Sequence, residues 1–190
     1  MLHLAALLSL KPVNERSIRN LVLIGFMGTG KSTVGRLIAA QLGYTFVDTD
    51  HLIESRAGKS ISEIFAQSGE GAFRAFEREM VADLKGFERA VVATGGGLGA
   101  DPDNLASLKA HACVICLWAS PKSILDRVGQ QTHRPMLQSP NPLERINQLL
   151  AVRDPVYRLA DALINTENRS VKEVAQQVVH QFHIVRHGSA

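Results

Sequence analysis

The stretch LVLIGFMGTGKS, from Leu21 to Ser32, decides the fold of this chain. Four apolar residues typical of a buried strand run directly into G-x-x-x-x-G-K-[ST], the pattern of a phosphate-binding loop or P-loop. Glycines let the backbone amides surround a phosphate, and the helix that begins near Lys31 adds the positive end of its dipole. Lys31 supplies a mobile cation for the β- and γ-phosphates, and Ser32 offers a hydroxyl to Mg²⁺. The strand before the loop and the helix after it argue against a chance match.

Short apolar runs alternate with longer amphipathic stretches, which predicts strands that alternate with helices. Several runs are apolar at consecutive positions, as expected for strands that are buried on both faces. The expected strands are Asn20–Gly25, Thr45–Asp48, Ala90–Thr94, Ala112–Trp118 and Ala162–Asn165. The expected helices are Lys31–Leu42, His51–Ala57, Ile61–Gln67, Gly71–Lys85, Ala106–Ala110, Lys122–Gly129, Pro142–Arg153 and Val171–Phe182. This order predicts a three-layer α/β/α fold around a parallel sheet, with ligands bound at the carboxyl ends of the strands.

Length and composition limit the class of protein. The chain has 190 residues, of which 45% are apolar and 21% charged, and this fits one globular domain with its own core. The net charge of +3 suits a protein that handles small anions and is too small to indicate nucleic-acid binding. The apolar residues 1–10 are too short to span a bilayer and lack the basic start of a secretory signal. We therefore expect a cytoplasmic protein that is not bound to a membrane.

Two cysteines, Cys113 and Cys116, form a CxxC pattern inside an expected strand. Positions three apart on a strand point to opposite faces, so the pattern predicts two core thiols and not a metal or redox site. Two cysteines also make no disulfide framework, which favours a reducing compartment.

Three further segments carry polar groups or bare backbone that could form a site. Asp48 and Asp50 share a face at the end of the second strand, where one could hold a water bound to Mg²⁺ and the other could orient a hydroxyl; a turn with a helix cap is the alternative. Arg74 and Glu77 share a helix face, either in a site or as a surface ion pair. The glycine triplet, residues 95–97, leaves its backbone open to a ligand unless it is only a flexible turn. Behind a P-loop, the functional interpretation of the acidic pair is favoured.

Taken together and in order, these segments resemble the shikimate kinase family. The resemblance rests on GFMGTGKSTVG (25–35), DTD (48–50), Gly58 with SISEIF (60–65), GEGAFRAFE (69–77), ATGGG (93–97), RPML (134–137) and RDPVY (153–157). It covers residues 20–182 with family-like spacing, and the DTD, FRxxE and GGG segments make it specific, whereas a P-loop alone names no substrate. The resemblance implies a P-loop kinase fold like that of nucleoside monophosphate kinases, with a five-stranded parallel sheet and a mobile lid.

The same resemblance implies the function. It implies an enzyme that transfers the γ-phosphate of ATP to the 3-hydroxyl of shikimate, a step of chorismate and aromatic amino-acid biosynthesis. ATP and shikimate are the implied partners, Mg²⁺ is the implied cofactor, and the family is usually cytoplasmic and monomeric. Residues 1–19 precede the usual start of the family and are expected to form an N-terminal extension, either a helix or a disordered tail. Residues 20–190 are expected to form a single domain.

Matching positions carry the implied roles. The nucleotide-binding residues are Gly28, Thr29, Gly30, Lys31, Ser32, Thr33, Arg127, Arg134 and Arg169. The shikimate-binding residues are Asp50, Arg74, Glu77, Gly95, Gly96, Gly97 and Arg153. The metal-site residues are Ser32 and Asp48, and the catalytic residues are Lys31, Asp50 and Arg134. Arg74 and Arg153 are implied to clamp the shikimate carboxylate, since an arginine fork matches a carboxylate and lysine does not. Lys31 is expected to be exposed where the loop meets the helix.

The segment 130–141 is polar and long for an ordinary connection, and it contains Arg134. We expect it to be the mobile lid that closes over the bound substrates and excludes water. A related kinase for another hydroxy acid such as gluconate is the nearest alternative, and the paired arginines with DTD and the glycine triplet argue against it. A non-catalytic regulator with a kinase fold is the other alternative, but it should have lost Lys31, Asp50 or an arginine, or gained a DNA-binding domain.

Overall fold

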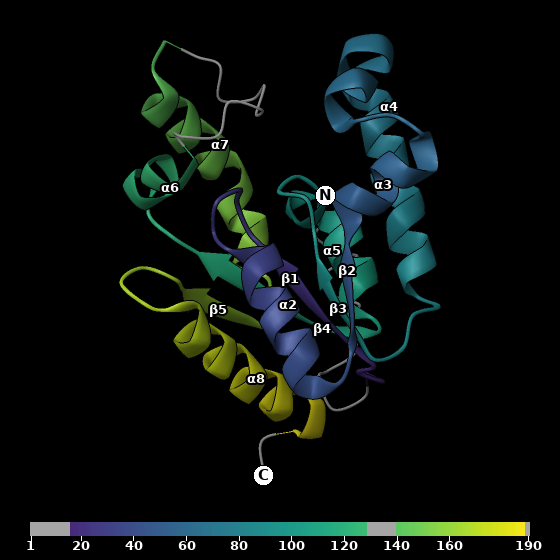
Figure 1. The fold of residues 1–190 in the computed structure, drawn as a ribbon, viewed down its shortest axis with the longest axis vertical. Coiled ribbons are helices and arrows are strands. Elements are labelled where there is room, and N and C mark those ends of the chain that lie inside the picture. The colour runs from purple at the N-terminus through teal and green to yellow at the C-terminus, as the bar shows by residue number, and fades with distance from the viewer. Residues whose placement is uncertain (1–15, 129–139, 189–190) are drawn as a thin grey trace.

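Five parallel strands form one sheet in a computed structural model that describes residues 16–128 and 140–188 (Figure 1). Along the chain, the strands are β1 Asn20–Ile24, β2 Thr45–Asp48, β3 Ala90–Ala93, β4 Ala112–Trp118 and β5 Ala162–Asn165. Their order in the sheet is β2-β3-β1-β4-β5. The helices are α2 Lys31–Leu42, α3 Thr49–Ala57, α4 Ile61–Leu84, α5 Pro102–Lys109, α6 Pro121–Val128, α7 Pro142–Tyr157 and α8 Val171–His187. The expected five-stranded parallel sheet and its strand positions are confirmed.

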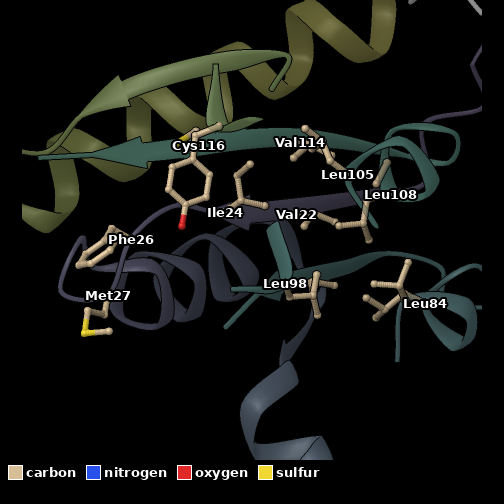
Figure 2. Close-up of a cluster of buried hydrophobic side chains, with 14 of the residues drawn as sticks. Val22, Ile24, Phe26, Met27, Leu84, Leu98, Leu105, Leu108, Val114 and Cys116 are labelled. Carbon is tan, nitrogen blue, oxygen red and sulfur yellow. The ribbon is translucent and has the colours of Figure 1, made fainter. Parts of the chain in front are cut away.

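Helices cover both faces of the sheet, because the central strands β1, β3 and β4 are apolar and buried on both sides. Leu21 and Leu23 of β1 pack with α2 and α8, which lie together on one face (Figure 1). Val22 and Ile24 point to the other face, where they meet side chains of α4, α5 and α7. Figure 2 shows this second cluster, with the P-loop residue Phe26 at its end next to Ile24. The P-loop is therefore anchored in the core on which the sheet is built.

The two cysteines of β4 lie on opposite faces of the sheet, as the sequence predicts. Cys113 packs in the cluster under α2 and α8, and Cys116 packs in the cluster shown in Figure 2. Burial raises the pKa of the Cys113 thiol and raises that of Cys116 to about 12. Both thiols are therefore neutral and inert, and the core interpretation of the CxxC pattern is confirmed.

Several helix boundaries differ from those expected, and the differences in α3 and α4 bear on the candidate site. Asp50 lies in the first turn of α3 and not on the strand, because Asp48 ends β2 and caps the helix by accepting from Asp50 N at 3.1 Å. The helices expected at Ile61–Gln67 and Gly71–Lys85 run together as α4, and the backbone leaves helical geometry only at Gly69, where φ is 76°. The acidic pair is thus both a helix cap and a candidate site.

The topology places a binding site beside the carboxyl end of β1. The chain passes through α2 from β1 to β2, on one side of β1 in the sheet, and through α5 from β3 to β4, on the other side of β1, so these connections diverge at this point. Helices α3 and α4 rise beyond one side of the sheet, and α6 and α7 rise beyond the other (Figure 1). Ligands bound here can be reached by side chains from both arms.

Residues 16–19 lie at the opposite, amino-terminal edge of the sheet. The Arg16 guanidinium donates to Asp161 Oδ1 at 2.8 Å and to the carbonyl of Lys109, and Ile18 is buried against the sheet. The residues of the expected N-terminal extension nearest to the domain are therefore part of its packing. Among the helices that the structure describes, none is long and apolar enough to cross a membrane.

Candidate active site

The P-loop joins the end of β1 to the start of α2. Gly30, at the N-cap of α2, has a φ of 92°. Because glycine has no side chain, it makes no capping hydrogen bond to the amides of the first turn. Thr29 is buried and donates through its hydroxyl to the carbonyl of Phe26 at 2.8 Å, which fixes the bend of the loop. Thr33 follows on the first turn of α2 and is exposed. This end of the helix can hold a phosphate with backbone amides and its dipole.

Lys31 is buried rather than exposed, so that expectation is wrong. Its side chain folds back on the loop, where Nζ donates to the carbonyls of Gly25 at 2.9 Å and Phe26 at 2.8 Å. The loop's own carbonyls attract the ammonium because they face inward at the same point. An incoming phosphate has to exchange with these carbonyls, and the lysine already lies inside the cradle.

Ser32 and Asp48 meet across the gap between the P-loop and the end of β2. The Ser32 hydroxyl donates to Asp48 Oδ2 at 2.8 Å, and the other carboxylate oxygen caps α3. A hydroxyl and a carboxylate oxygen are ligands of the kind that Mg²⁺ prefers, with phosphate and water oxygens completing the shell. The two residues expected at the metal are therefore adjacent and fit such an ion.

Asp50 lies against the glycine triplet that follows β3. A Cβ atom on Gly95 would overlap with Asp50 Oδ1, so only glycine allows the carboxylate and the triplet to come this close. The amide of Gly95 donates to Thr49 Oγ1 at 3.0 Å, which ties the triplet to the same helix start. The acidic pair and the triplet thus form one unit at the ends of β2 and β3.

Arg74 reaches the other end of the triplet from α4. A Cβ on Gly97 would overlap with Arg74 Nη1, and that nitrogen donates to Glu77 Oε2 at 2.6 Å. Glu77 is only 1% exposed, and burial raises the pKa of its carboxyl group while the Arg74 guanidinium lowers it. Glu70 holds the opposite side of the same guanidinium at 2.7 Å. Since Glu77 is buried and Arg74 is half-buried, this is an oriented pair and not the surface ion pair that the sequence left open.

Arg153 approaches the middle of the triplet from α7. Its side chain is buried, its guanidinium lies 5.5 Å from the ring centre of Phe26, and Nη1 is 3.5 Å from the carbonyl oxygen of Gly96. The helix continues one turn beyond the predicted end, so that Tyr157 also lies here and donates through its hydroxyl to the same carbonyl at 2.5 Å. The negative charge of Asp50 raises the pKa of the Glu77 carboxyl group, and the positive charge of Arg153 lowers it. The residues expected to contact an acceptor therefore lie together, with the charged side chains coming from both arms.

The nucleotide side of the site is closed by α6 and the segment after β5. Arg127 Nη1 donates to Thr166 Oγ1 at 2.8 Å and to the carbonyl of Gly28 at 3.3 Å, so it lies beside the P-loop, and its contact with the adenine stays a prediction. Arg169 instead donates to the carbonyl of Asn165 and to Gln177, on the outer side of the same segment. Its proposed contact with the nucleotide stays a prediction.

A further carboxylate, which the sequence did not single out, holds this segment in place. Glu167 accepts from the hydroxyls of Ser120 and Ser123, both at 2.5 Å, and these hydrogen bonds lower the pKa of its carboxyl group to about 2. It links the loop after β4 to the loop after β5. The expected lid at 130–141 and its Arg134 lie outside the described residues, apart from Pro140 and Asn141.

Thr49 and Tyr157 are the other residues that sequence reasoning missed. Each contacts the triplet through a hydroxyl, at Gly95 N and Gly96 O respectively. Their only signals in the sequence are position, since one lies between the two acids and the other one helical turn after Arg153. Because the phosphate-binding loop lies next to a carboxylate and two arginines, the fold and the site together define a P-loop kinase that acts on a small molecule.

Comparison with known proteins gives the family. A family model described as shikimate kinase matches residues 27–183. Shikimate kinase of Thermodesulfovibrio yellowstonii is 45% identical over 171 residues, which are 90% of this chain and 99% of that protein. Shikimate kinase of Thermus thermophilus is also 45% identical, over 88% of this chain and 91% of that protein. The chain belongs to the shikimate kinase family.

Solved structures support the same conclusion. Shikimate kinase from Acinetobacter baumannii in complex with shikimate has a TM-score of 0.84 at 35% identity and covers 94% of this chain and 100% of that one. A gluconokinase from Sinorhizobium meliloti has a TM-score of 0.61 at 17% identity and covers 91% and 96%, so this likeness shows the fold alone. The predicted P-loop kinase fold and the predicted family are confirmed.

Proposed function

We propose that this chain transfers the γ-phosphoryl group of ATP to the 3-hydroxyl of shikimate, in the synthesis of chorismate and aromatic amino acids. One observation carries the proposal beyond family membership: Arg74 and Arg153 converge on the glycine triplet, next to Asp50 and within reach of the P-loop. A carboxylate and vicinal hydroxyls are the groups that two arginine forks and an aspartate recognise. Shikimate carries both, on a small ring.

The P-loop supplies the nucleotide half of the reaction. Amides of the loop and of the first turn of α2 hold the phosphates, and Lys31 exchanges its two carbonyl partners for phosphate oxygens. Ser32 and Asp48 are the residues that would hold Mg²⁺ between them, and the ion supplies positive charge to the β- and γ-phosphates when it is bound. Arg127 lies beside the P-loop, and we assign it to the contact with the adenine.

The arginine arms supply the acceptor half. Arg153 and Arg74 bind the shikimate carboxylate, and Glu77 holds Arg74 in place through its 2.6 Å hydrogen bond. The buried position of Glu77 makes this orientation rigid, since a carboxylate removed from water keeps its charge only with such a partner. Gly96 and its neighbours form the floor on which the ring lies.

Asp50 is the residue that we assign to the reacting hydroxyl. It lies at the start of α3 against Gly95, between the metal-site residue Asp48 and the acceptor floor. In phosphoryl transfer the bond to the leaving group is largely broken before the proton leaves, so the main task of the carboxylate is to orient the hydroxyl and accept its proton late. Arg134 is proposed, from the sequence alone, to add charge at the transferring phosphate.

The remaining expectations complete the proposal. We infer that the enzyme works in the cytoplasm, where ATP is available and where two free thiols, Cys113 and Cys116, stay reduced. From the resemblance to the family, we also infer that it acts as a monomer, with residues 20–190 as one unit. Light scattering at catalytic concentrations tests the monomer.

A coupled ADP-release assay tests the function. Shikimate, gluconate and buffer are supplied separately as acceptors to the same enzyme, with ATP and Mg²⁺ in excess. We expect ADP release that depends on shikimate and a background rate with gluconate or buffer. Rapid release with gluconate and none with shikimate supports the alternative hydroxy-acid kinase, and no release with either supports a non-catalytic protein.

A further inference from the structure

The glycine triplet is held by two side-chain hydroxyls from opposite arms of the site. Thr49, at the first position of α3, accepts a hydrogen bond from Gly95 N at 3.0 Å. Tyr157, in the last turn of α7, donates one to Gly96 O at 2.5 Å. Both residues are buried, at 0% and 2% exposure, so water does not replace these bonds.

The position of the triplet affects the site because charged side chains contact it at both ends. Asp50 leaves no room for a Cβ at Gly95, and Arg74 leaves none at Gly97. A small shift of this backbone therefore displaces the carboxylate that faces the acceptor hydroxyl or the arginine that faces the acceptor carboxylate. Glycine itself resists such shifts poorly, since it has more backbone freedom than any other residue.

Tyr157 has a second effect, on Arg153. The Gly96 carbonyl is a buried acceptor, and Arg153 Nη1 lies only 3.5 Å from it. The Tyr157 hydroxyl donates to the same carbonyl oxygen at 2.5 Å, and because a carbonyl oxygen has two lone pairs, the two side chains share it and Tyr157 helps to hold the acceptor that orients the guanidinium. Burial raises the pKa of the Tyr157 phenol, which keeps it protonated as a donor.

We propose that Thr49 and Tyr157 are positioning residues for the acceptor substrate: they fix the glycine triplet between Asp50 and the arginine clamp, and Tyr157 holds the Gly96 carbonyl that also orients Arg153. This inference rests on the proposed function of the site. Neither residue touches the reacting atoms, and neither lies in the P-loop. Loss of either hydroxyl therefore weakens the acceptor half of the site and spares the nucleotide half.

Two nearly isosteric substitutions test this inference. Tyr157→Phe and Thr49→Val each delete one hydroxyl and keep the packing volume. We expect the KM for shikimate to rise about tenfold in each, the equivalent of one buried hydrogen bond, while the KM for ATP changes less than about twofold. Thr49→Ser keeps the hydroxyl and should restore the wild-type KM for shikimate.

Tyr44→Phe is the matched control for the tyrosine. Tyr44 also uses its hydroxyl in one hydrogen bond, from Arg186 at 2.9 Å, but it lies just before β2 at the far edge of the sheet. We expect this variant to keep both KM values and to lose less thermal stability than Tyr157→Phe, because water can replace its exposed hydrogen bond. A role of Tyr157 that is only structural would leave the KM for shikimate of Tyr157→Phe as unchanged as that of Tyr44→Phe.

The outcomes separate this inference from the function on which it rests. Unchanged shikimate KM values in Tyr157→Phe and Thr49→Val, or equal increases for ATP and shikimate, overturn the positioning role while the kinase stands. A wild-type enzyme that fails to phosphorylate shikimate overturns the proposed function and this inference with it. Either substitution decides the question if the other variant does not fold.

Discussion

The hydroxyl of Ser32 donates to Asp48 Oδ2 at 2.8 Å, which joins the start of α2 to the end of β2. The same carboxylate caps α3 through its other oxygen and thereby fixes Asp50 in the first turn of that helix. Asp48 therefore connects the nucleotide half of the site to the group that faces the acceptor. Substitutions at Asp48 and at Asp50 should therefore affect metal binding and the reaction of the acceptor hydroxyl separately.

Asp48→Asn should raise the Mg²⁺ concentration needed for half-maximal activity by about tenfold, because the amide keeps the shape but loses a charge that attracts the ion. A Mg²⁺ titration at fixed ATP measures the effect. Asp103→Asn, in the exposed first turn of α5, is the control and should leave the titration unchanged. An unaltered Mg²⁺ requirement in Asp48→Asn would place the metal elsewhere.

Asp50→Asn should lower kcat by about a hundredfold or more, since the amide can orient the hydroxyl but cannot accept its proton. Nucleotide affinity, measured by fluorescence or calorimetry, should stay within about twofold. A change confined to KM would show that Asp50 binds the acceptor without taking part in the chemical step. Asp126→Asn, on the exposed face of α6, serves as the control.

Arg153→Lys should raise the KM for shikimate roughly ten- to a hundredfold and leave the KM for ATP nearly unchanged. Lysine keeps the charge, but it loses the planar fork and the contact with the ring of Phe26. Arg158→Lys, five positions later with an exposed side chain, is the matched control. Equal KM values for wild type and Arg153→Lys would remove this arginine from the clamp.

The parts of the fold and site that could be predicted from the sequence are those with a local signal. The strands are continuous apolar runs and the P-loop is a contiguous motif, so Gly28 to Ser32 could be assigned before any coordinates. Arg153 could be assigned only through the resemblance to a family, because nothing near it in the sequence marks a carboxylate clamp.

Long-range contacts were the part that could not be predicted. The hydrogen bond from Tyr157 to Gly96 joins positions 61 residues apart, and no sequence pattern within either segment predicts it. The burial of Lys31 has a similar origin, since the carbonyls that hold it face inward only once the loop is folded. The prediction that Asp50 shares the end of the strand with Asp48 was wrong for a local reason. Asp48 is the N-cap of α3, so the helix begins at the next residue.

His111 should make the protein less stable below neutral pH. Its two ring nitrogens have no hydrogen-bond partner among the described residues, and burial, with the charges of Lys85 and Arg19, lowers its pKa. The unfolded chain, with a pKa of about 6.5, then binds more protons, so stability is full above about pH 6.5 and falls as the pH drops toward the folded pKa.

Unfolding in urea at pH 7.5 and 5.5 measures this dependence. We expect His111→Leu to lose less stability than the wild type between the two values, and His180→Gln, at an exposed position of α8, to behave like the wild type. Equal pH dependence in His111→Leu and the wild type would contradict the assignment.

Identification of the product tests the central claim most directly. The enzyme is incubated with ATP, Mg²⁺ and shikimate, and the product is examined by mass spectrometry and by phosphorus–proton correlation in NMR. The site predicts one phosphate per shikimate, attached to the 3-oxygen, in an amount equal to the ADP formed. Phosphate on another oxygen, or ADP without a phosphorylated product, would contradict the assignment of Asp50 and the arginine clamp to the acceptor.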